Sequence, residues 1–169
     1  MQSDKSVYNC VVFGVPDEPQ GKARPRFARR GKLVSTYTPQ ATQKYEELIR
    51  YSALKVRQKN GIDKPISGNI ILNIRAYFKI PKSYSKKRKD RCLNGDERPT
   101  KKPDSDNIAK IVLDGLNPKM KVDHAQHKAV CVNEGLYRDD KQVVSLKVDK
   151  YYSDKPRVEI TAFWDDEED

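Results

Sequence analysis

The strongest constraint on the fold is a stretch in which apolar and polar residues alternate. Between Gly68 and Ile80 the apolar positions recur at every second residue, at Ile70, Leu72, Ile74, Ala76 and Phe78. A period of two places successive side chains on opposite faces of an extended chain, so this stretch predicts a long strand with one buried face. Such a face must be covered by another layer of structure.

Two segments with helical spacing are predicted to form that layer. The first begins at Thr38-Pro39, with Thr38 as the N-cap and Pro39 in the first turn, and ends at Asn60-Gly61. The second covers Asp106–Leu116, with Asp106 as its N-cap. Its predicted buried face comprises Ile108, Ile111, Val112 and Leu116.

Shorter patterns complete the prediction. Val7–Val15 is rich in β-formers and predicts a first strand, while Ser85–Cys92 predicts a short helix. Val143–Tyr152 and Arg157–Trp164 alternate around a turn and predict a terminal hairpin, and Pro16–Thr38 predicts a loop. We therefore expect an α/β (α+β) fold, a single-domain mixed sheet packed against two main helices. The domain is expected over residues 1–164, followed by an acidic tail over 165–169.

The charge balance favours an anionic partner. The chain has 34 basic and 24 acidic residues, a net charge of +10, and removing the five acids of the tail leaves +15 on residues 1–164. A basic surface of this kind attracts phosphate polymers, although it is also compatible with a merely solvated surface. No apolar run has signal-peptide or membrane-spanning length, and the three cysteines form no paired motif. These features predict a cytoplasmic protein without a membrane association.

Against this basic background, acidic residues gather around the second predicted helix. Asp104 and Asp106 precede or begin it, Asp114 follows on the same face, and Asp139-Asp140 comes later. Oxygen ligands of this kind suit Mg²⁺, which usually binds one or two carboxylates together with phosphate oxygens. The alternative is purely structural: Asp106 caps the helix, Asp104 makes an Asx-turn and Lys110 pairs with an acid. Ile108-Ala109 excludes an EF-hand loop.

The order of these blocks resembles the RusA family of Holliday junction resolvases. The resemblance rests on Pro-Asp-x-Asp-Asn-x-x-Lys at 103–110, Asp-Gly-Leu at 114–116 and Asp-Asp-x-Gln-Val at 139–143. The segments Gly21–Phe27 and Tyr37–Pro39 are similar to a Gram-positive phage branch of that family. The resemblance implies a small homodimeric, prophage-type endonuclease that requires a divalent metal.

Site residues follow from the resemblance position by position. Asp104, Asp106 and Asp140 match the acids that bind the metal, and Lys110 matches the catalytic lysine. Asp139 and Asp114 are further candidate ligands, or turn and surface acids. The expected cofactor is Mg²⁺, with Mn²⁺ as a substitute, and three acids close together would repel one another without a cation. A lysine at Lys110 would stabilise the extra charge of the transition state.

The expected reaction is phosphodiester hydrolysis in a four-way DNA junction, within recombination and repair. A less selective branched-DNA or flap endonuclease is the alternative enzyme, and a non-catalytic nucleic-acid-binding module is the alternative outside enzymes. The basic residues expected to grip DNA phosphates are Lys22, Arg24, Arg26, Arg29 and Arg30. Lys86–Lys89 forms a second basic group that fits either DNA contact or a solvated helix face. Tyr37 is a candidate for stacking on an opened junction.

One segment departs from the family pattern. Asn117–Arg138 is longer than the corresponding stretch of many family members and holds His124, His127 and Cys131. Their spacing fits a zinc site with Asp123 as a fourth ligand, but no second ligand pair accompanies them. An inserted loop is therefore the preferred interpretation.

Overall fold

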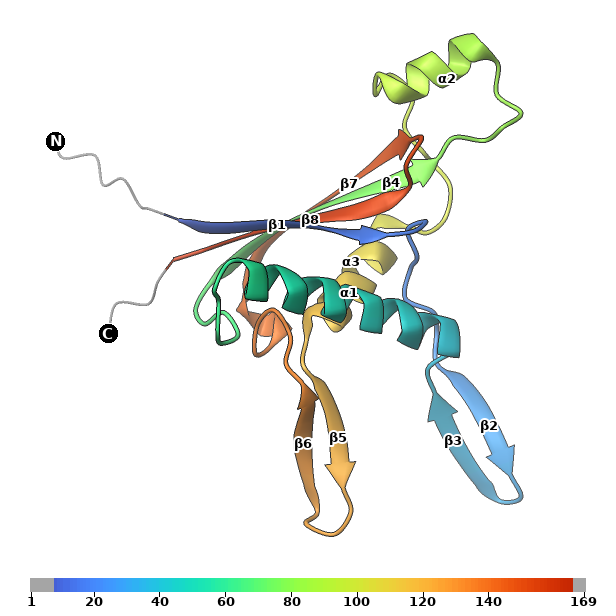
Figure 1. Ribbon diagram of the computed structural model, residues 1–169. Helices are drawn as coiled ribbons and strands as arrows, with labels where there is room; N and C mark the ends of the chain where they lie inside the picture. The colour runs from blue at the N-terminus through green and yellow to red at the C-terminus, as the bar shows by residue number, and fades with distance from the viewer. Residues whose placement is uncertain (1–7, 166–169) are drawn as a thin grey trace, which may run out of the picture.

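The computed structural model describes residues 8–165. Eight strands and three α-helices follow one another along this part of the chain, with one short 3₁₀ turn, η1 (Asp140–Gln142). The strands are β1 (Asn9–Pro16), β2 (Arg26–Arg30), β3 (Leu33–Tyr37), β4 (Ile70–Lys79), β5 (Lys119–Asp123), β6 (Lys128–Asn133), β7 (Val143–Ser153) and β8 (Arg157–Trp164). The helices are α1 (Gln40–Lys59), α2 (Lys86–Leu93) and α3 (Ser105–Leu116). Figure 1 shows α1 and α3 on one side of the main sheet and α2 beyond its opposite side. The predicted mixed sheet packed against two main helices is confirmed.

The main sheet has the strand order β1-β8-β4-β7. β4 pairs with β8 in antiparallel and with β7 in parallel orientation, so it lies between two strands that follow each other in the sequence. The prediction that β7 and β8 form a terminal hairpin is therefore wrong, because these two strands do not pair with each other. Both strands and the turn between them are present as predicted. Alternation within each strand carries no information about which neighbour it will pair with.

The predicted alternation in β4 is confirmed residue by residue. Ile70, Leu72, Ile74, Ala76 and Phe78 are all buried beneath the two helices. From α3, Ile108, Ile111, Val112 and Leu116 meet them, as predicted, and α1 contributes Tyr45, Ile49 and Ala53. The two helices approach closely at Gly115, where a Cβ would lie 2.7 Å from the Cβ of Ile49. Burying this set of side chains is what fixes α3 under β4 and β7.

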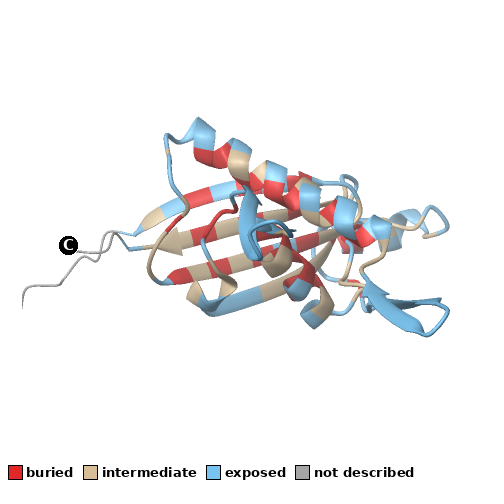
Figure 2. Cartoon of the chain, turned by 90° about the horizontal axis from the view of Figure 1, so that it is seen from below, coloured by how far each residue is buried: buried red, intermediate tan, exposed pale blue. Residues whose placement is uncertain are grey.

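Two hairpins project from the body on the side of α1 that faces away from the sheet (Figure 1). β2 and β3 pair over a two-residue turn, where Gly31 has a φ of +61° that glycine accepts readily. This hairpin lies in the segment Pro16–Thr38, so the prediction that the whole segment is a loop is wrong. The second hairpin, β5 and β6, forms most of the segment interpreted as an inserted loop. Figure 2 shows both hairpins exposed, so the body of the protein does not bury them.

Helix starts differ from the prediction by one or two residues. The N-cap of α1 is Pro39 rather than Thr38, and the N-cap of α3 is Asp104 rather than Asp106. In α3 the backbone of Asp104 is extended and its carbonyl accepts the amide of Ile108, so Asp106 falls in the first turn. α2 begins where predicted, with Ser85 accepting a hydrogen bond from the Arg88 amide.

Within residues 8–165, none of the helices combines the length and apolar character needed to cross a membrane. Val7, where the first strand was predicted to begin, and residues 166–169 of the acidic tail lie outside the described residues.

Candidate functional site

Two of the predicted site residues lie at the N-terminal end of α3. Asp104 is the N-cap and Asp106 is in the first turn, and both are exposed. Between residues 8 and 165 neither carboxylate has a hydrogen-bond or ion-pair partner, so neither an Asx-turn nor a side-chain cap occupies them. The positive end of the helix dipole favours negative charge at both positions. Asp104 also acts on Lys150 of β7: burial lowers the pKa of Lys150, and Asp104 opposes that change.

A strap of extended chain crosses this end of the helix at Gly21 and Lys22. The Lys22 amide donates to the Asn107 carbonyl at 3.1 Å. A Cβ on Gly21 would lie 2.8 Å from the Cβ of Pro103, so only glycine lets the strap lie this close. The strap therefore forms one wall of the site from a segment that lies far from α3 in the sequence.

The Lys22 side chain is held by two carboxylates. Its ammonium forms ion pairs with Glu46 of α1 and, at 2.8 Å, with Asp114 of α3. Burial lowers the pKa of Lys22, but the hydrogen bonds with Asp114 and Glu46 outweigh it, so that pKa lies above its usual value. Lys22 was predicted to contact DNA; in the structure it joins the strap to both main helices.

Next to the strap is a polar hollow of about 650 Å³. It is lined by Gly21, Lys22, Arg24, Lys102, Pro103, Asp104 and Asn107. Lys22 is already paired with Glu46 and Asp114, whereas Arg24 and Lys102 form no ion pair within residues 8–165, and Asp104 is a predicted metal ligand. A phosphate approaching Asp104 would therefore meet positive charge from Arg24 and Lys102.

The other predicted ligand, Asp140, lies at the opposite end of α3. It begins η1, and its Oδ2 accepts a hydrogen bond of 3.1 Å from Nδ2 of Asn117, the C-cap of α3. Asp139 caps η1, accepting from the Lys141 amide at 2.9 Å. Gln142 accepts from the Asp139 amide and donates to the carbonyls of Ile66 and Gly68. The Asp-Asp-x-Gln block thus builds a turn in which Asp139 is the structural acid and Asp140 points to α3.

Two buried residues hold this end of α3 in place. Tyr137 is fully buried and donates from its hydroxyl to the Leu113 carbonyl at 2.7 Å. Its pKa is raised, first by burial and then by the negative charges of Asp140, Asp114 and Asp139. Arg50 donates to the carbonyls of Asn117 and Asp114, the last acceptors of the helix.

The length of α3 separates the two groups of acids. Its 12 residues span roughly 18 Å at 1.5 Å per residue, with Asp104 at one end and Asp140 beside the other. A single copy of the chain therefore does not bring Asp104, Asp106 and Asp140 to one ion. Lys110 lies between them on the exposed side of the helix and, within residues 8–165, forms no ion pair. The alternative in which Lys110 pairs with a neighbouring acid is not what the structure shows, because Asp114 binds Lys22.

The donor chemistry at the start of α3 fits a hard cation. Across residues 8–165 no three His, Cys, Asp or Glu side chains gather in a metal-binding group. Asp104 and Asp106 offer unpaired carboxylate oxygens, and Mg²⁺ needs only one or two such ligands besides water and phosphate. His124, His127 and Cys131, the candidate zinc ligands, likewise do not gather in such a group within residues 8–165. Cys131 lies on β6, while His124 and His127 lie in the turn before it.

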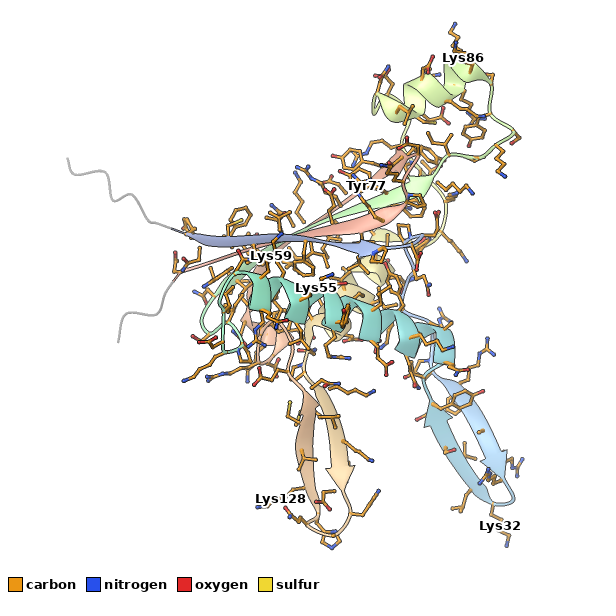
Figure 3. All side chains as sticks on the ribbon, in the orientation of Figure 1. Lys32, Lys55, Lys59, Tyr77, Lys86 and Lys128 are labelled. Carbon is orange, nitrogen blue, oxygen red and sulfur yellow. The ribbon has the colours of Figure 1, made fainter. Side chains whose placement is uncertain are left out.

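The remaining basic residues occupy exposed positions. Arg26, Arg29 and Arg30 lie on β2, and Figure 3 shows Lys32 at the tip of the same hairpin, away from the body. Tyr37 ends β3 and is about half exposed. In α2 Arg88 binds Glu97 and lies over the Tyr84 ring, so it is less available than its lysine neighbours.

Sequence reasoning missed several residues that shape the site. Glu46, Arg50, Asn117 and Tyr137 carry hydrogen bonds or ion pairs there, but no role was predicted for any of them. Gln142 belongs to the Asp-Asp-x-Gln-Val block, but no role was predicted for it. The one available signal was Gly21, because a glycine before Lys22 in a basic segment indicates close backbone approach.

Comparisons with known proteins show the family of this chain. The family model for endodeoxyribonuclease RusA matches residues 16–162. The uncharacterized protein YqaN of Bacillus subtilis (strain 168) is 36% identical over 154 residues, covering 90% of this chain and 94% of that protein. The family match includes the strap, both ends of α3 and the Asp-Asp-x-Gln turn. The chain therefore belongs to the RusA family of endodeoxyribonucleases.

Proposed function

We propose that this protein is a divalent-metal-dependent endodeoxyribonuclease that resolves four-way DNA junctions by phosphodiester hydrolysis and works as a homodimer. The observation that carries the proposal is the pair of unpaired carboxylates, Asp104 and Asp106, beside a cationic hollow at the start of α3. A protein that only bound DNA would gain nothing from exposed acids at a place where phosphates approach.

Asp104 and Asp106, together with Asp140, are the residues that would hold Mg²⁺ or Mn²⁺. The bound ion would activate water and polarise a phosphoryl oxygen. The protein's own part is to orient the DNA and to stabilise charge. Arg24 and Lys102 in the hollow would hold phosphate oxygens, and Lys110 would donate to an oxygen that becomes more negative in the transition state.

The separation along α3 supports a site shared between two copies. If two α3 helices lie antiparallel about a two-fold axis, Asp104 and Asp106 of one copy come beside Asp140 of the other. Two equivalent shared sites result, as a symmetric four-way junction with two cuts requires. Metal binding, and therefore cleavage, would then depend on dimer formation.

Cleavage assays test the activity itself. A synthetic four-way junction, a flap and a matched linear duplex are incubated with the protein, with and without Mg²⁺. We expect metal-dependent cleavage of the junction above the other two, and loss of cleavage without loss of junction binding in Asp104→Asn, Asp106→Asn and Asp140→Asn. Equal cleavage of the flap would favour the less selective nuclease, and full activity of Asp104→Asn would refute the site.

Mixing variants tests whether the site is shared. Asp106→Asn and Asp140→Asn are each expected to be inactive, but a mixed dimer has one site with both changes and one site with neither. We expect co-refolded mixtures to recover nicking of one strand. If each site lay within one copy, the mixed dimer would contain no intact site and the mixture would stay inactive.

A further inference from the structure

A groove between β1 and α1 is a feature of this molecule that the proposed nuclease activity does not use. Within the described sheet β1 pairs only with β8, so its other side is a sheet edge. Figure 1 shows α1 running beneath β1, and a hollow of about 350 Å³ lies between the two elements. None of the residues that line this hollow also lines the hollow beside Asp104.

The walls of this groove are largely apolar. Phe13 of β1 and Val56 of α1 line it and belong to the buried core. Val12 and Tyr51 also line it, yet they remain 60% and 63% exposed. Large apolar side chains that stay exposed around a hollow are typical of an interaction site. The volume lies at the lower end of the range for ligand pockets, roughly 300–1,000 Å³, and therefore suits a large side chain better than a whole cofactor.

The strand edge beside the groove is available for backbone pairing. In an edge strand every second residue directs its amide and carbonyl away from the sheet. From Cys10 to Val15, and among the described residues, no backbone group forms a hydrogen bond outside the pairing with β8. Pro16, which has no amide hydrogen, marks the point where this edge ends.

The rim of the groove is positively charged. Lys55 and Lys59 lie about one turn apart on α1, beside β1 (Figure 3), and both are exposed. Within residues 8–165 neither lysine forms an ion pair, and no acidic residue lines the groove. Lys59 also suits the negative end of the helix dipole, but Lys55 lies before the last turn and has no such role. The rim therefore favours a negatively charged partner.

We propose that this groove binds an extended acidic segment of a partner protein, which pairs with β1 as an added strand and places a large apolar side chain in the hollow. Pairing with β1 supplies backbone hydrogen bonds, the hollow selects the apolar side chain, and the two lysines select the Asp or Glu residues beside it. The lengths agree, because α1 from Leu48 to Lys59 is roughly 16 Å long at 1.5 Å per residue, and about five residues of an extended chain span the same distance.

Other occupants fit this groove less well. DNA has the required charge, but its phosphates only accept hydrogen bonds, whereas a strand edge presents donors and acceptors in alternation. A second copy of this chain paired through β1 would bring the lysines of both copies toward one another, and β1 contains no acid to compensate them. The acidic tail of this chain has the right charge, but residues 165–169 include no apolar side chain for the hollow.

Binding of defined peptides to the full chain tests the proposal. The probes are short fluorescent peptides with a central Leu, Ile, Phe or Trp and Asp or Glu at the other positions. Matched peptides carry Asn and Gln in place of the acids. By fluorescence anisotropy we expect the tightest acidic peptide to bind at least tenfold more tightly than its amide counterpart. If no acidic peptide exceeds its counterpart by this factor, the proposal is wrong.

Charge reversal tests whether the peptide binds in the groove. Lys55→Glu combined with Lys59→Glu should weaken binding of the tightest acidic peptide at least tenfold. The control is Lys86→Glu combined with Lys87→Glu, which makes the same change of charge on α2 and should leave binding unchanged. Thermal melts confirm that both double variants are folded. Equal losses in the two variants would mean general attraction to a basic protein and would overturn the proposal.

Modified peptides test the added strand and the occupant. N-methylation of alternate amides removes the donors from one edge of the peptide, so one methylated set should abolish binding and the intervening set should not. Equal effects of the two sets would refute pairing with β1. Displacement of the peptide by duplex DNA would assign the groove to nucleic acid instead. Binding that becomes at least tenfold tighter when residues 166–169 are deleted would assign it to the chain's own tail.

Discussion

At the residue scale, the acids of the site divide into those with partners and those without. Asp114 binds Lys22, Asp139 caps η1, and Asp140 accepts from Asn117, whereas Asp104 and Asp106 have no hydrogen-bond or ion-pair partner within residues 8–165. The sequence blocks set Asp104, Asp106 and Asp140 apart from Asp139 and Asp114 as ligands, but they did not indicate which of the five acids have partners. Local geometry shows that Asp114 and Asp139 form structural contacts, that Asp140 has one amide partner, and that Asp104 and Asp106 have none among the described residues.

Lys110 should affect turnover rather than affinity. Because it has no ion-pair partner among the described residues, replacing it should leave the fold intact. We expect Lys110→Ala to lower kcat by about 10²-fold, the order found when one electrostatic interaction with the transition state is removed. Single-turnover cleavage and junction binding would be measured beside Lys55→Ala, a lysine at an exposed position of α1. Normal cleavage by Lys110→Ala would remove it from the catalytic group.

Lys22 should affect stability. Lys22→Met leaves Glu46 and Asp114 facing each other without the ammonium, which should lower the free energy of unfolding by about 2 kcal/mol. Lys119→Met is the matched control, because Lys119 forms a single exposed pair with Glu47 and should change stability by less than about 1 kcal/mol. Urea unfolding gives both values, and equal losses would contradict a special role for Lys22.

The pH dependence of this difference has a definite sign. The folded-state pKa of Lys22 is raised, so its contribution is fully present below the usual lysine pKa and is lost as the pH rises through the folded value. The gap between wild type and Lys22→Met should therefore be constant from about pH 6 to 9 and shrink above about pH 10. A gap that closes near neutral pH would argue against the ion pairs.

At the scale of elements, the β2–β3 hairpin is the most exposed basic part of the described chain. All ten residues of its two strands are exposed, and its tip extends away from the core (Figure 3). The body of the protein gives this hairpin no packing partner among the described residues, so its side chains are available to a ligand. This hairpin lies on the side of α1 opposite the sheet, whereas α2 is beyond the sheet's other face (Figure 1).

Neutralising this hairpin should weaken DNA binding without affecting stability. Changing Arg26, Arg29 and Arg30 to Gln should reduce the slope of log affinity against log salt by about 0.9 for each phosphate that is no longer neutralised. The control carries the same loss of charge on α2, at Lys86, Lys87 and Lys89. Titrations of one junction at several salt concentrations decide between the two surfaces, and equal slopes would show that the hairpin has no particular role in binding DNA.

At the scale of the whole molecule, metal binding and assembly should be linked. If the metal site is shared between two copies, as we propose, its ion binds only in the dimer and therefore stabilises the dimer as well. Ca²⁺ or Mg²⁺ at about ten times its dissociation constant should raise stability by about 1.4 kcal/mol, a shift of a few degrees in Tm. Thermal melts at constant ionic strength should show this shift in the wild type but not in Asp104→Asn. A full shift in Asp104→Asn would place the bound ion away from this site.

The sequence by itself determined the local features of this protein. The sequence predicted the buried face of β4 and the buried face of α3. These features were predictable because hydrophobic periodicity and helix capping depend on residues only a few positions apart. The predicted helix starts were wrong by only one or two residues, at Thr38 and Asp106.

Tertiary structure alone decided which strands pair and where the acids lie. β4 enters between β7 and β8 because pairing partners are chosen by contacts between distant segments, which strand periodicity does not encode. The spacing of Asp104 and Asp140 along the chain likewise carried no sign that they would lie at opposite ends of one helix. The separation of Asp104 and Asp140 follows from the length of α3 and from the position of the turn that holds Asp140. Gln142 fixes that turn by donating to the carbonyls of Ile66 and Gly68, just before β4. The positions of the helix and of the turn are both set by packing around a shared core.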